Sequence, residues 1–222
     1  MLNLIENTPA PDAKLKRLPA LTPFSATAVR HFDPRHPERS ETSKTYRTAV
    51  ANFHYIPRTL GADHLGRIPD GYMAKTGDLV ATGRRYPQTA PLHLQHGVQL
   101  WAAADAATVA NLAYPAAWHL VLRLHDDGGP EEWQRLVEEW IDRHLVTIGV
   151  ISDWALHSQT DANGEWTTRP HCHVLATVRR WKAHQQEGRP IADWLFNEAH
   201  RKILEDRWLA AAKIARTPFT LD

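Results

Sequence analysis

Apolar residues in the segment GGPEEWQRLVEEWIDRHL (128–145) recur with the period of an α-helix. One helical face, at positions i, i+3, i+4 and i+7, is taken by Trp133, Leu136, Val137 and Trp140. Pro130 suits the first turn, where its missing N–H has no partner to lose, and the two glutamates after it favour the helix dipole. The pattern predicts an amphipathic helix whose tryptophans lie in the core.

A period of two follows in other segments and predicts strands. In AWHLVLRLH (117–125) the leucines alternate with His119, Arg123 and His125. The apolar segment VISDWALH (150–157) is a second strand, and SQTDANGEWTTRP (158–170) has the Asp, Asn, Gly, Thr and Pro content of a loop. The chain then returns through His171, which predicts an antiparallel hairpin with a long polar turn.

The remaining segments complete an α/β chain. We expect a helix from Tyr46 to about Phe53, a glycine-rich connector at 61–91, a helix at 96–113 and a C-terminal helix from about Ile191 to Ala215. Four prolines and scattered charge predict a flexible lead over residues 1–25, followed by one domain over 26–222. Helices interleaved with strands, including a hairpin, predict an α/β sandwich with helices packed on the sheet.

Composition narrows the class of protein further. The 222 residues include 43% apolar residues and nine tryptophans, enough for one large core. The net charge of +1 gives no global signal for nucleic acid, and the single cysteine excludes an internal disulfide. No apolar run approaches the roughly 20 residues of a membrane span, and no signal peptide is evident. These features predict a cytoplasmic protein without a membrane span.

Three histidines on the two hairpin segments outline a metal site. His171 and His173 project from one face of their strand while Cys172 points to the other. His157 ends the partner strand and lies across from them, and Asp153 shares its face, so this carboxylate could orient the imidazoles from behind. Imidazole ligands alone favour zinc or another transition metal. The alternative is a chance pair on a solvated face, because the chain has 14 histidines.

This block resembles the MobA/MobL family of plasmid mobilization relaxases, a branch of the HUH endonucleases in which two histidines flank one residue on a central strand. The matching residues are Asp153, Ala155, Leu156, His157, Pro170, His171, His173, Thr177 and Arg179, while Cys172 stands where alanine is usual. Residues 92–124 and 189–212 resemble the family's helix–strand unit and its terminal helix. The resemblance implies an HUH relaxase-like sandwich with a mainly antiparallel central sheet.

The resemblance also implies an activity. Such relaxases nick single-stranded DNA at an origin of transfer through a tyrosine that becomes joined to the 5′ phosphate, and they later rejoin the strand. The segment SKTYRTAVANF (43–53) offers Tyr46 as the nucleophile, with Tyr55 and Tyr72 as competitors. The implied cofactor is Mg²⁺ or Mn²⁺, with Zn²⁺ possible, acting as a Lewis acid on a phosphate oxygen.

Some positions depart from the family pattern. Thr108 and His119 stand where the family commonly carries acidic residues, and FSATAVRHFDPRHPERS (24–40) replaces its first strand. Asp105 and Asp153 are therefore the candidate catalytic carboxylates, as base or as orienting acid. The alternative is that both have structural roles only: Asp105 as a solvated charge on its helix and Asp153 as a capping residue of the hairpin.

Basic residues near the candidate site predict contacts with DNA phosphates. They are Lys44 and Arg47 beside the candidate nucleophile, and Arg179 and Arg180 after the histidine strand. The alternative is an ordinary solvated basic face. The implied partners are single-stranded plasmid DNA at an origin of transfer, accessory mobilization proteins and a coupling protein.

Three functions remain open on these grounds. The favoured one is a DNA-nicking relaxase that uses Tyr46 and the three histidines. The second is a DNA-binding relative that has lost cleavage, because Thr108 and His119 replace acids. The third is an unrelated metal-dependent hydrolase that activates water, for which Tyr46 would be irrelevant.

Overall fold

A five-stranded antiparallel sheet forms the centre of the computed structural model, which describes residues 22–30, 48–63, 66–67, 71–110, 115–182, 188–191, 194–195 and 197–214. The strand order is β1–β5–β7–β6–β4, so the two strands of the long hairpin lie inside the sheet. The strands are β1 (Phe24–Val29), β4 (Leu79–Arg85), β5 (Ala117–Arg123), β6 (Ser152–Thr160) and β7 (Trp166–Thr177). Two short ribbons flank it, β2–β3 (Ala62–Asp63, Gly66–Arg67) and β8–β9 (Arg179–Arg180, Arg189–Pro190).

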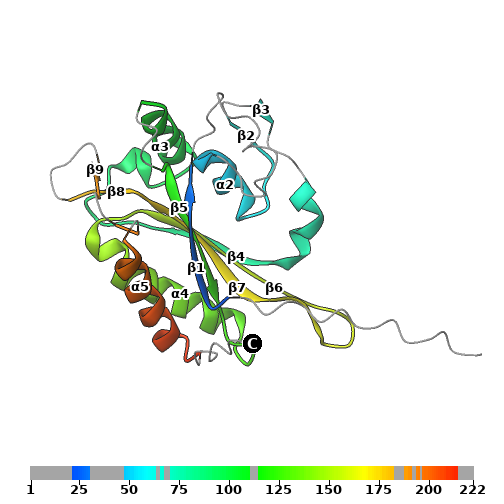
Figure 1. Ribbon diagram of the computed structural model, residues 1–222. Helices are drawn as coiled ribbons and strands as arrows, with labels where there is room; N and C mark the ends of the chain where they lie inside the picture. Colours follow the sequence, from blue (N-terminus) through cyan, green and yellow to red (C-terminus); the bar gives the residue numbers. More distant parts are fainter. Residues whose placement is uncertain are drawn as a thin grey trace, which may run out of the picture.

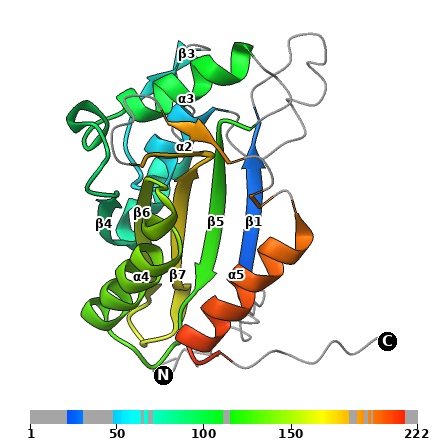
Figure 2. The same cartoon turned by 90° about the vertical axis from the view of Figure 1, so that its left-hand side faces the viewer.

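Helices cover both faces of this sheet (Figures 1 and 2). On one face lie α2 (Ala49–Tyr55) and α3 (Gln99–Ala110), and on the other lie α4 (Pro130–His144) and α5 (Glu198–Ala211). The 3₁₀ segments are η1 (Gly71–Asp78), η2 (Leu92–Leu94) and η3 (Val146–Ile148). The expected sandwich, a mainly antiparallel sheet with helices packed on it, is confirmed. Of the helices described, none combines the length and apolar character needed to cross a bilayer.

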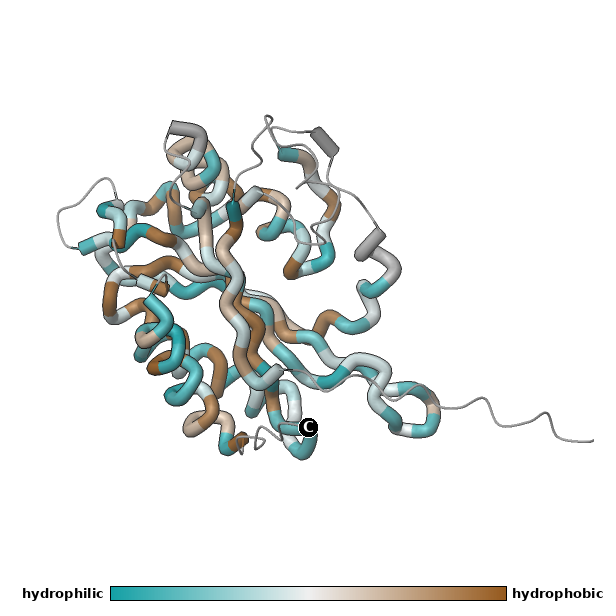
Figure 3. The backbone as a smooth tube through the Cα atoms, in the orientation of Figure 1, coloured by the Kyte–Doolittle hydropathy of each residue, from teal (hydrophilic) through white to brown (hydrophobic). Residues whose placement is uncertain are grey.

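The α4/α5 face holds the larger core. Leu120, Leu122 and Leu124 of the β5 segment are fully buried there, as the period of two predicted. Trp140 of α4 meets Trp208 of α5 edge to face, with ring centroids 5.6 Å apart. Figure 3 shows the hydrophobic colour concentrated in the central strands, while the outer tip of the β6–β7 hairpin is hydrophilic. The predicted amphipathic helix is confirmed with its tryptophans inside.

The opposite face is buried as well, beneath α2 and α3. Ala155 of β6, Leu175 of β7 and Trp101 of α3 are fully buried in this second core. Because both faces are covered, alternation of side chains assigns each strand residue to one core or the other. The histidine face of the hairpin is the α2/α3 face.

Two strands were not anticipated from the sequence. β1 begins at Phe24, inside the segment whose sequence departs from the family's first strand, and it spans the predicted boundary after residue 25. The connector expected at 61–91 contains η1 and the edge strand β4. Gly83 interrupts the strand pattern of β4 in the sequence. A Cβ at this position would lie 2.7 Å from the Trp154 indole, so the glycine allows the close approach of that ring.

The helix before the site also has different limits from those expected. It runs from Ala49 to Tyr55 and starts after Thr48, whose hydroxyl accepts a hydrogen bond from the Ala51 N–H at 2.9 Å. A threonine at this position satisfies a backbone donor that the helix leaves unpaired. The shift carries Tyr55 into the last turn of α2.

Removing the Trp140 side chain tests the packing of the α4/α5 core. Trp140→Ala should lower the free energy of unfolding by about 3–5 kcal/mol, because a buried aromatic ring leaves a cavity that the sheet cannot close. Urea denaturation measures the loss. Ile203→Ala on the exposed side of α5 is the control and should change the value by less than about 1 kcal/mol.

Candidate metal centre and active site

The hairpin brings the three predicted histidines together. The β6–β7 register pairs His157 directly with His171, and His173 lies two residues further along the same face of β7. The ring centroids are separated by 5.3 Å (His157–His171), 5.2 Å (His157–His173) and 4.9 Å (His171–His173). The three imidazoles therefore form a nearly equilateral triangle on the α2/α3 face.

Each of these rings uses its Nδ1 atom in a hydrogen bond. His157 Nδ1 lies 2.7 Å from an Asp78 carboxylate oxygen, and His171 Nδ1 lies 2.8 Å from the Arg169 carbonyl oxygen. His173 Nδ1 lies 2.8 Å from Nε2 of His119. Carboxylate and carbonyl oxygens only accept, so His157 and His171 carry their protons on Nδ1 and keep the Nε2 lone pair.

The Nε2 side of this cluster has the chemistry of a metal site. Within the part of the chain described, His157 Nε2 is buried and makes no hydrogen bond, an expensive state for a polar atom. A point equidistant from the three ring centroids lies about 3 Å from each, compatible with imidazole–metal bonds of about 2.0–2.1 Å. As the described residues are placed, no three His, Cys, Asp or Glu side chains are grouped so that they could hold a metal ion. The case for a metal site here rests on the donor chemistry of the Nε2 atoms that hydrogen bonding leaves as acceptors.

Burial keeps these imidazoles neutral. Desolvation lowers the pKa of His157 to about 4, although Asp78 opposes the shift. Desolvation also lowers the pKa of His171, and it lowers that of His173 further because the neighbouring imidazoles add to it. The pKa of His119 is lowered to about 4 by burial and by the nearby Arg58 charge. Neutral imidazole is the form that binds metal ions.

Asp78 and Arg58 support the cluster from behind, and neither was singled out in the sequence. Arg58 Nη2 lies 3.3 Å from an Asp78 oxygen, and both side chains are buried. Burial alone would raise the pKa of Asp78, but hydrogen bonds from His157 and Arg58 hold it below the usual value. Asp78 is 79 residues from His157 in the chain, so only the β4–β6 pairing reveals their contact.

Tyr55 is the tyrosine that the described residues bring to the histidines. Its ring centroid is 5.5 Å from that of His173 and 6.0 Å from that of His119. The Arg58 guanidinium lies over the same ring, 4.8 Å from its centroid, and donates to the Tyr55 carbonyl oxygen. Burial alone would lower the pKa of Arg58, but hydrogen bonds to the Asp78 and Tyr55 side chains raise it. The predicted residues Lys44, Tyr46 and Arg47 lie outside the described residues, as does the Tyr72 side chain.

A cavity of about 370 Å³ opens beside these groups. Tyr55, Arg58 and Lys75 line it together with His171 and His173. Lys75 comes from η1 and is exposed, whereas Arg58 is buried and paired with Asp78, which also lines the cavity. Two cations against this one carboxylate leave a net positive lining, which favours an anionic ligand such as a phosphodiester.

The two carboxylates predicted to be catalytic support the scaffold. Asp105 accepts hydrogen bonds from the Ala49 and Val50 N–H groups and so holds the first turn of α2. Asp153 accepts from Arg84 at 2.6 Å through both oxygens and from the Trp101 indole. Asp153 and His157 are four positions apart along β6, about 13 Å of extended chain. The carboxylate behind His157 is therefore Asp78, while the catalytic roles predicted for Asp105 and Asp153 stay untested.

The two predicted acid replacements also differ in position. Thr108 donates its hydroxyl to the Ala104 carbonyl oxygen on its own helix. His119 instead lies in the cluster, against both His173 and Tyr55. Of these two residues, only His119 contacts the histidine cluster in the part of the chain that the structure describes.

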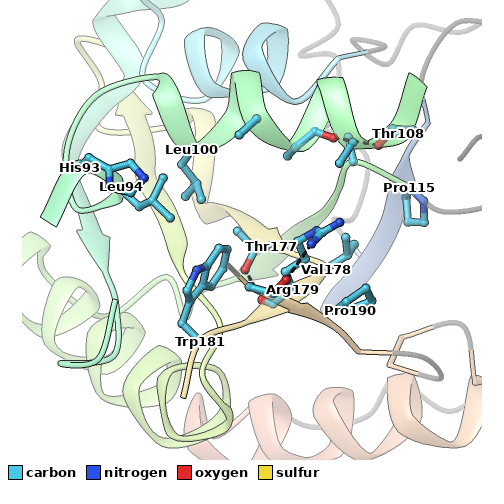
Figure 4. Close-up of a pocket in the computed structure, with 15 residues that line it drawn as sticks. His93, Leu94, Leu100, Thr108, Pro115, Thr177, Val178, Arg179, Trp181 and Pro190 are labelled. Atoms are coloured by element: carbon cyan, nitrogen blue, oxygen red, sulfur yellow. Dashed lines mark hydrogen bonds between the residues drawn. The ribbon is translucent and has the colours of Figure 1, made fainter. Parts of the chain in front are cut away.

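A second cavity, of about 420 Å³, lies between α3 and the end of β7 (Figure 4). Most of its walls are apolar, and Thr177, Arg179 and Trp181 contribute polar atoms. The Arg179 guanidinium donates to the Gly188 carbonyl oxygen at 2.7 Å and so helps fix the β8–β9 ribbon. The Arg180 side chain is half-buried. DNA binding by these two arginines stays a prediction.

The fold and the histidine cluster define a relaxase-like α/β sandwich. The MobA/MobL family model matches residues 47–207, and the chain belongs to the MobA/MobL family. This membership supports a plasmid mobilization relaxase. The fold is similar to a solved structure from work on the molecular basis of vancomycin resistance transfer in Staphylococcus aureus, with a TM-score of 0.60 and 17% identity over 85% of this chain and 89% of that one. A comparison with curated proteins gives no match.

Substitutions of Asp78 and Asp153 distinguish the carboxylate that supports His157 from the one that stabilises the fold. Asp78→Asn should weaken Mn²⁺ binding about 10–100-fold, because the carboxylate fixes the His157 tautomer. Asp153→Asn should leave the affinity unchanged but lower the free energy of unfolding by about 3 kcal/mol, since it strands a buried Arg84 charge. Titration calorimetry and urea denaturation measure the two effects. Equal losses of affinity in both variants would contradict this assignment.

The depressed histidine pKa values predict how stability depends on pH in the metal-free protein. The unfolded chain binds protons on His119 and His157 near pH 6.5, whereas the folded protein binds them only near pH 4. Between these values the unfolded state binds more protons, so stability should fall as the pH drops from about 7 to about 5. Urea midpoints across this range measure it. A curve without slope there would show that these rings take up protons in the folded protein as readily as in the unfolded chain.

Proposed function

We propose that this protein is a relaxase that nicks single-stranded DNA at an origin of transfer and uses Tyr55 as the nucleophile. One observation carries the proposal: the Tyr55 ring packs with its centroid 5.5 Å from that of His173, at the edge of the three-histidine cluster. Family membership supports the substrate class, because the chain belongs to the MobA/MobL family. The cavity beside Tyr55 is lined by the Arg58 and Lys75 cations and the single Asp78 carboxylate, a net positive lining that suits the phosphodiester of a DNA strand.

One observation favours Tyr55 as the nucleophile. Tyr55 ends α2, whose first turn is held by Asp105, and this helix keeps the Tyr55 ring against the histidines. Tyr46 lies two residues before the Thr48 cap and stays the alternative nucleophile.

The residues of the site have separate parts in the proposed reaction. His157, His171 and His173 would hold a divalent ion, Mg²⁺ or Mn²⁺ with Zn²⁺ possible, through their Nε2 atoms. That ion would supply Lewis acidity at a non-bridging phosphate oxygen. Arg58 and Lys75 would bind the same phosphate as cations, with Arg58 held in place by Asp78.

The chemical step is a transesterification. The Tyr55 oxygen forms a bond to phosphorus as the bond from phosphorus to the 3′ oxygen breaks. The phenol loses a proton and the departing 3′ oxygen gains one, so a 5′-phosphotyrosine and a free 3′-hydroxyl result. Arg58 would stabilise negative charge on the attacking oxygen, because its guanidinium interacts with the Tyr55 side chain. The product retains a phosphodiester, so the reverse step can rejoin the strand.

Covalent capture tests the nucleophile directly. The protein is incubated with Mn²⁺ and a single-stranded oligonucleotide that carries its plasmid's transfer origin, and denaturing electrophoresis then detects the adduct. Tyr55→Phe should abolish the adduct, at least about 10³-fold, because no oxygen remains to attack. Tyr46→Phe is the matched control, since it removes the same hydroxyl from the same chain, and it should still form the adduct.

The other outcomes separate the remaining alternatives. Loss of the adduct in Tyr46→Phe alone would return the nucleophile to Tyr46. DNA binding without an adduct in the unaltered protein would indicate a relative that has lost cleavage. Strand cleavage that both tyrosine variants retain would indicate a hydrolase that activates water. Accessory mobilization proteins and a coupling protein stay predicted partners.

A further inference from the structure

His119 of β5 makes a hydrogen bond to His173, one of the three site histidines. Its Nε2 lies 2.8 Å from His173 Nδ1, and the ring centroids are 4.9 Å apart. The β5–β7 register pairs Val121 with His173 and His119 with Leu175, so the two imidazoles are diagonal neighbours on one sheet face. The bond therefore joins two adjacent strands at the histidine cluster.

A hydrogen bond between two neutral imidazoles contains one proton, and its location decides what His173 can do. If His173 carries the proton on Nδ1, its Nε2 keeps a lone pair that can bind a metal ion. If His119 carries the proton on Nε2, His173 must accept at Nδ1, and its own proton moves to Nε2 and blocks that atom. The tautomer of His119 therefore controls whether His173 is a ligand.

The other two histidines face no such choice. His157 donates to the Asp78 carboxylate and His171 donates to the Arg169 carbonyl oxygen, and neither oxygen can donate in return. His173 alone has a partner that can act in either direction. Its tautomer is thus set by a ring that also packs against Tyr55.

We infer that His119 is a positioning residue: it accepts the His173 Nδ1–H through Nε2 and so presents His173 Nε2 to the metal ion of the proposed function. His119 has this role at a position where the family commonly carries an acidic residue. A neutral acceptor brings no charge to the site, so Asp78 supplies the negative charge that increases the basicity of a ligand, and it does so on His157 only.

A pair of substitutions separates acceptance by His119 from simple packing. His119→Phe keeps an aromatic ring against Tyr55 and His173 but has no acceptor. His119→Gln has a side-chain carbonyl oxygen that can take the place of Nε2. His96→Gln, in an exposed loop, is the control for the loss of an imidazole elsewhere.

Two readouts are made on the full chain. Calorimetry measures Mn²⁺ affinity, and ¹⁵N NMR of the metal-free protein at about pH 8 reports which His173 nitrogen carries the proton. His119→Phe should weaken Mn²⁺ binding about 10–100-fold and shift His173 toward the Nε2–H tautomer. His119→Gln and His96→Gln should retain both the affinity and the Nδ1–H tautomer. The tautomer is a signature that a purely structural role would not change.

The inference is overturned if His119→Phe keeps the unaltered affinity and the Nδ1–H tautomer of His173. Because the inference rests on the proposed metal site, His171→Ala is measured alongside. Unchanged Mn²⁺ affinity in His171→Ala would overturn that site, and the NMR readout, which needs no metal, would still decide the role of His119. Loss of affinity in His171→Ala with no effect of His119→Phe would overturn the present inference alone.

Discussion

The pairing of His157 with His171 across the β6–β7 hairpin is the constraint on which the site depends. A slip of one residue would turn His171 and His173 to the opposite face of the sheet. The other face prevents that slip, because Leu156, Cys172 and Val174 are fully buried against the α4/α5 core. The energy that fixes the histidine cluster thus comes from apolar packing on the far side of the same two strands.

Polar contacts then convert this register into chemistry. Asp78, Arg169 and His119 each engage one Nδ1 atom, so the three rings are oriented from behind. Arg58 links Asp78 to the Tyr55 ring and lies in the left-handed region at φ 58°, a conformation that costs free energy for a residue with a side chain. Such strain in a buried arginine is characteristic of a site where position matters more than stability.

Much of the fold could be predicted from the sequence. The helix with Trp133 and Trp140, the hairpin and the face shared by its histidines follow from periods of 3.6 and 2. β4 could not be predicted in this way, since Gly83 and the arginines that follow it hide the pattern of an edge strand. Long-range partners were also beyond reach: neither Asp78 behind His157 nor Asp105 at the first turn of α2 has a local signal. The candidate nucleophile shows the same limit, because Tyr55 reaches the histidines only through the length and anchoring of α2.

In the proposed site the three Nε2 atoms, and not the Nδ1 atoms, would surround a single metal ion. Crystals of the protein grown with Mn²⁺ and measured for anomalous scattering test this arrangement directly. The expected result is one anomalous peak within about 2.2 Å of Nε2 of His157, His171 and His173. A peak beside a Nδ1 atom, or bound Mn²⁺ with no peak among these rings, would contradict it.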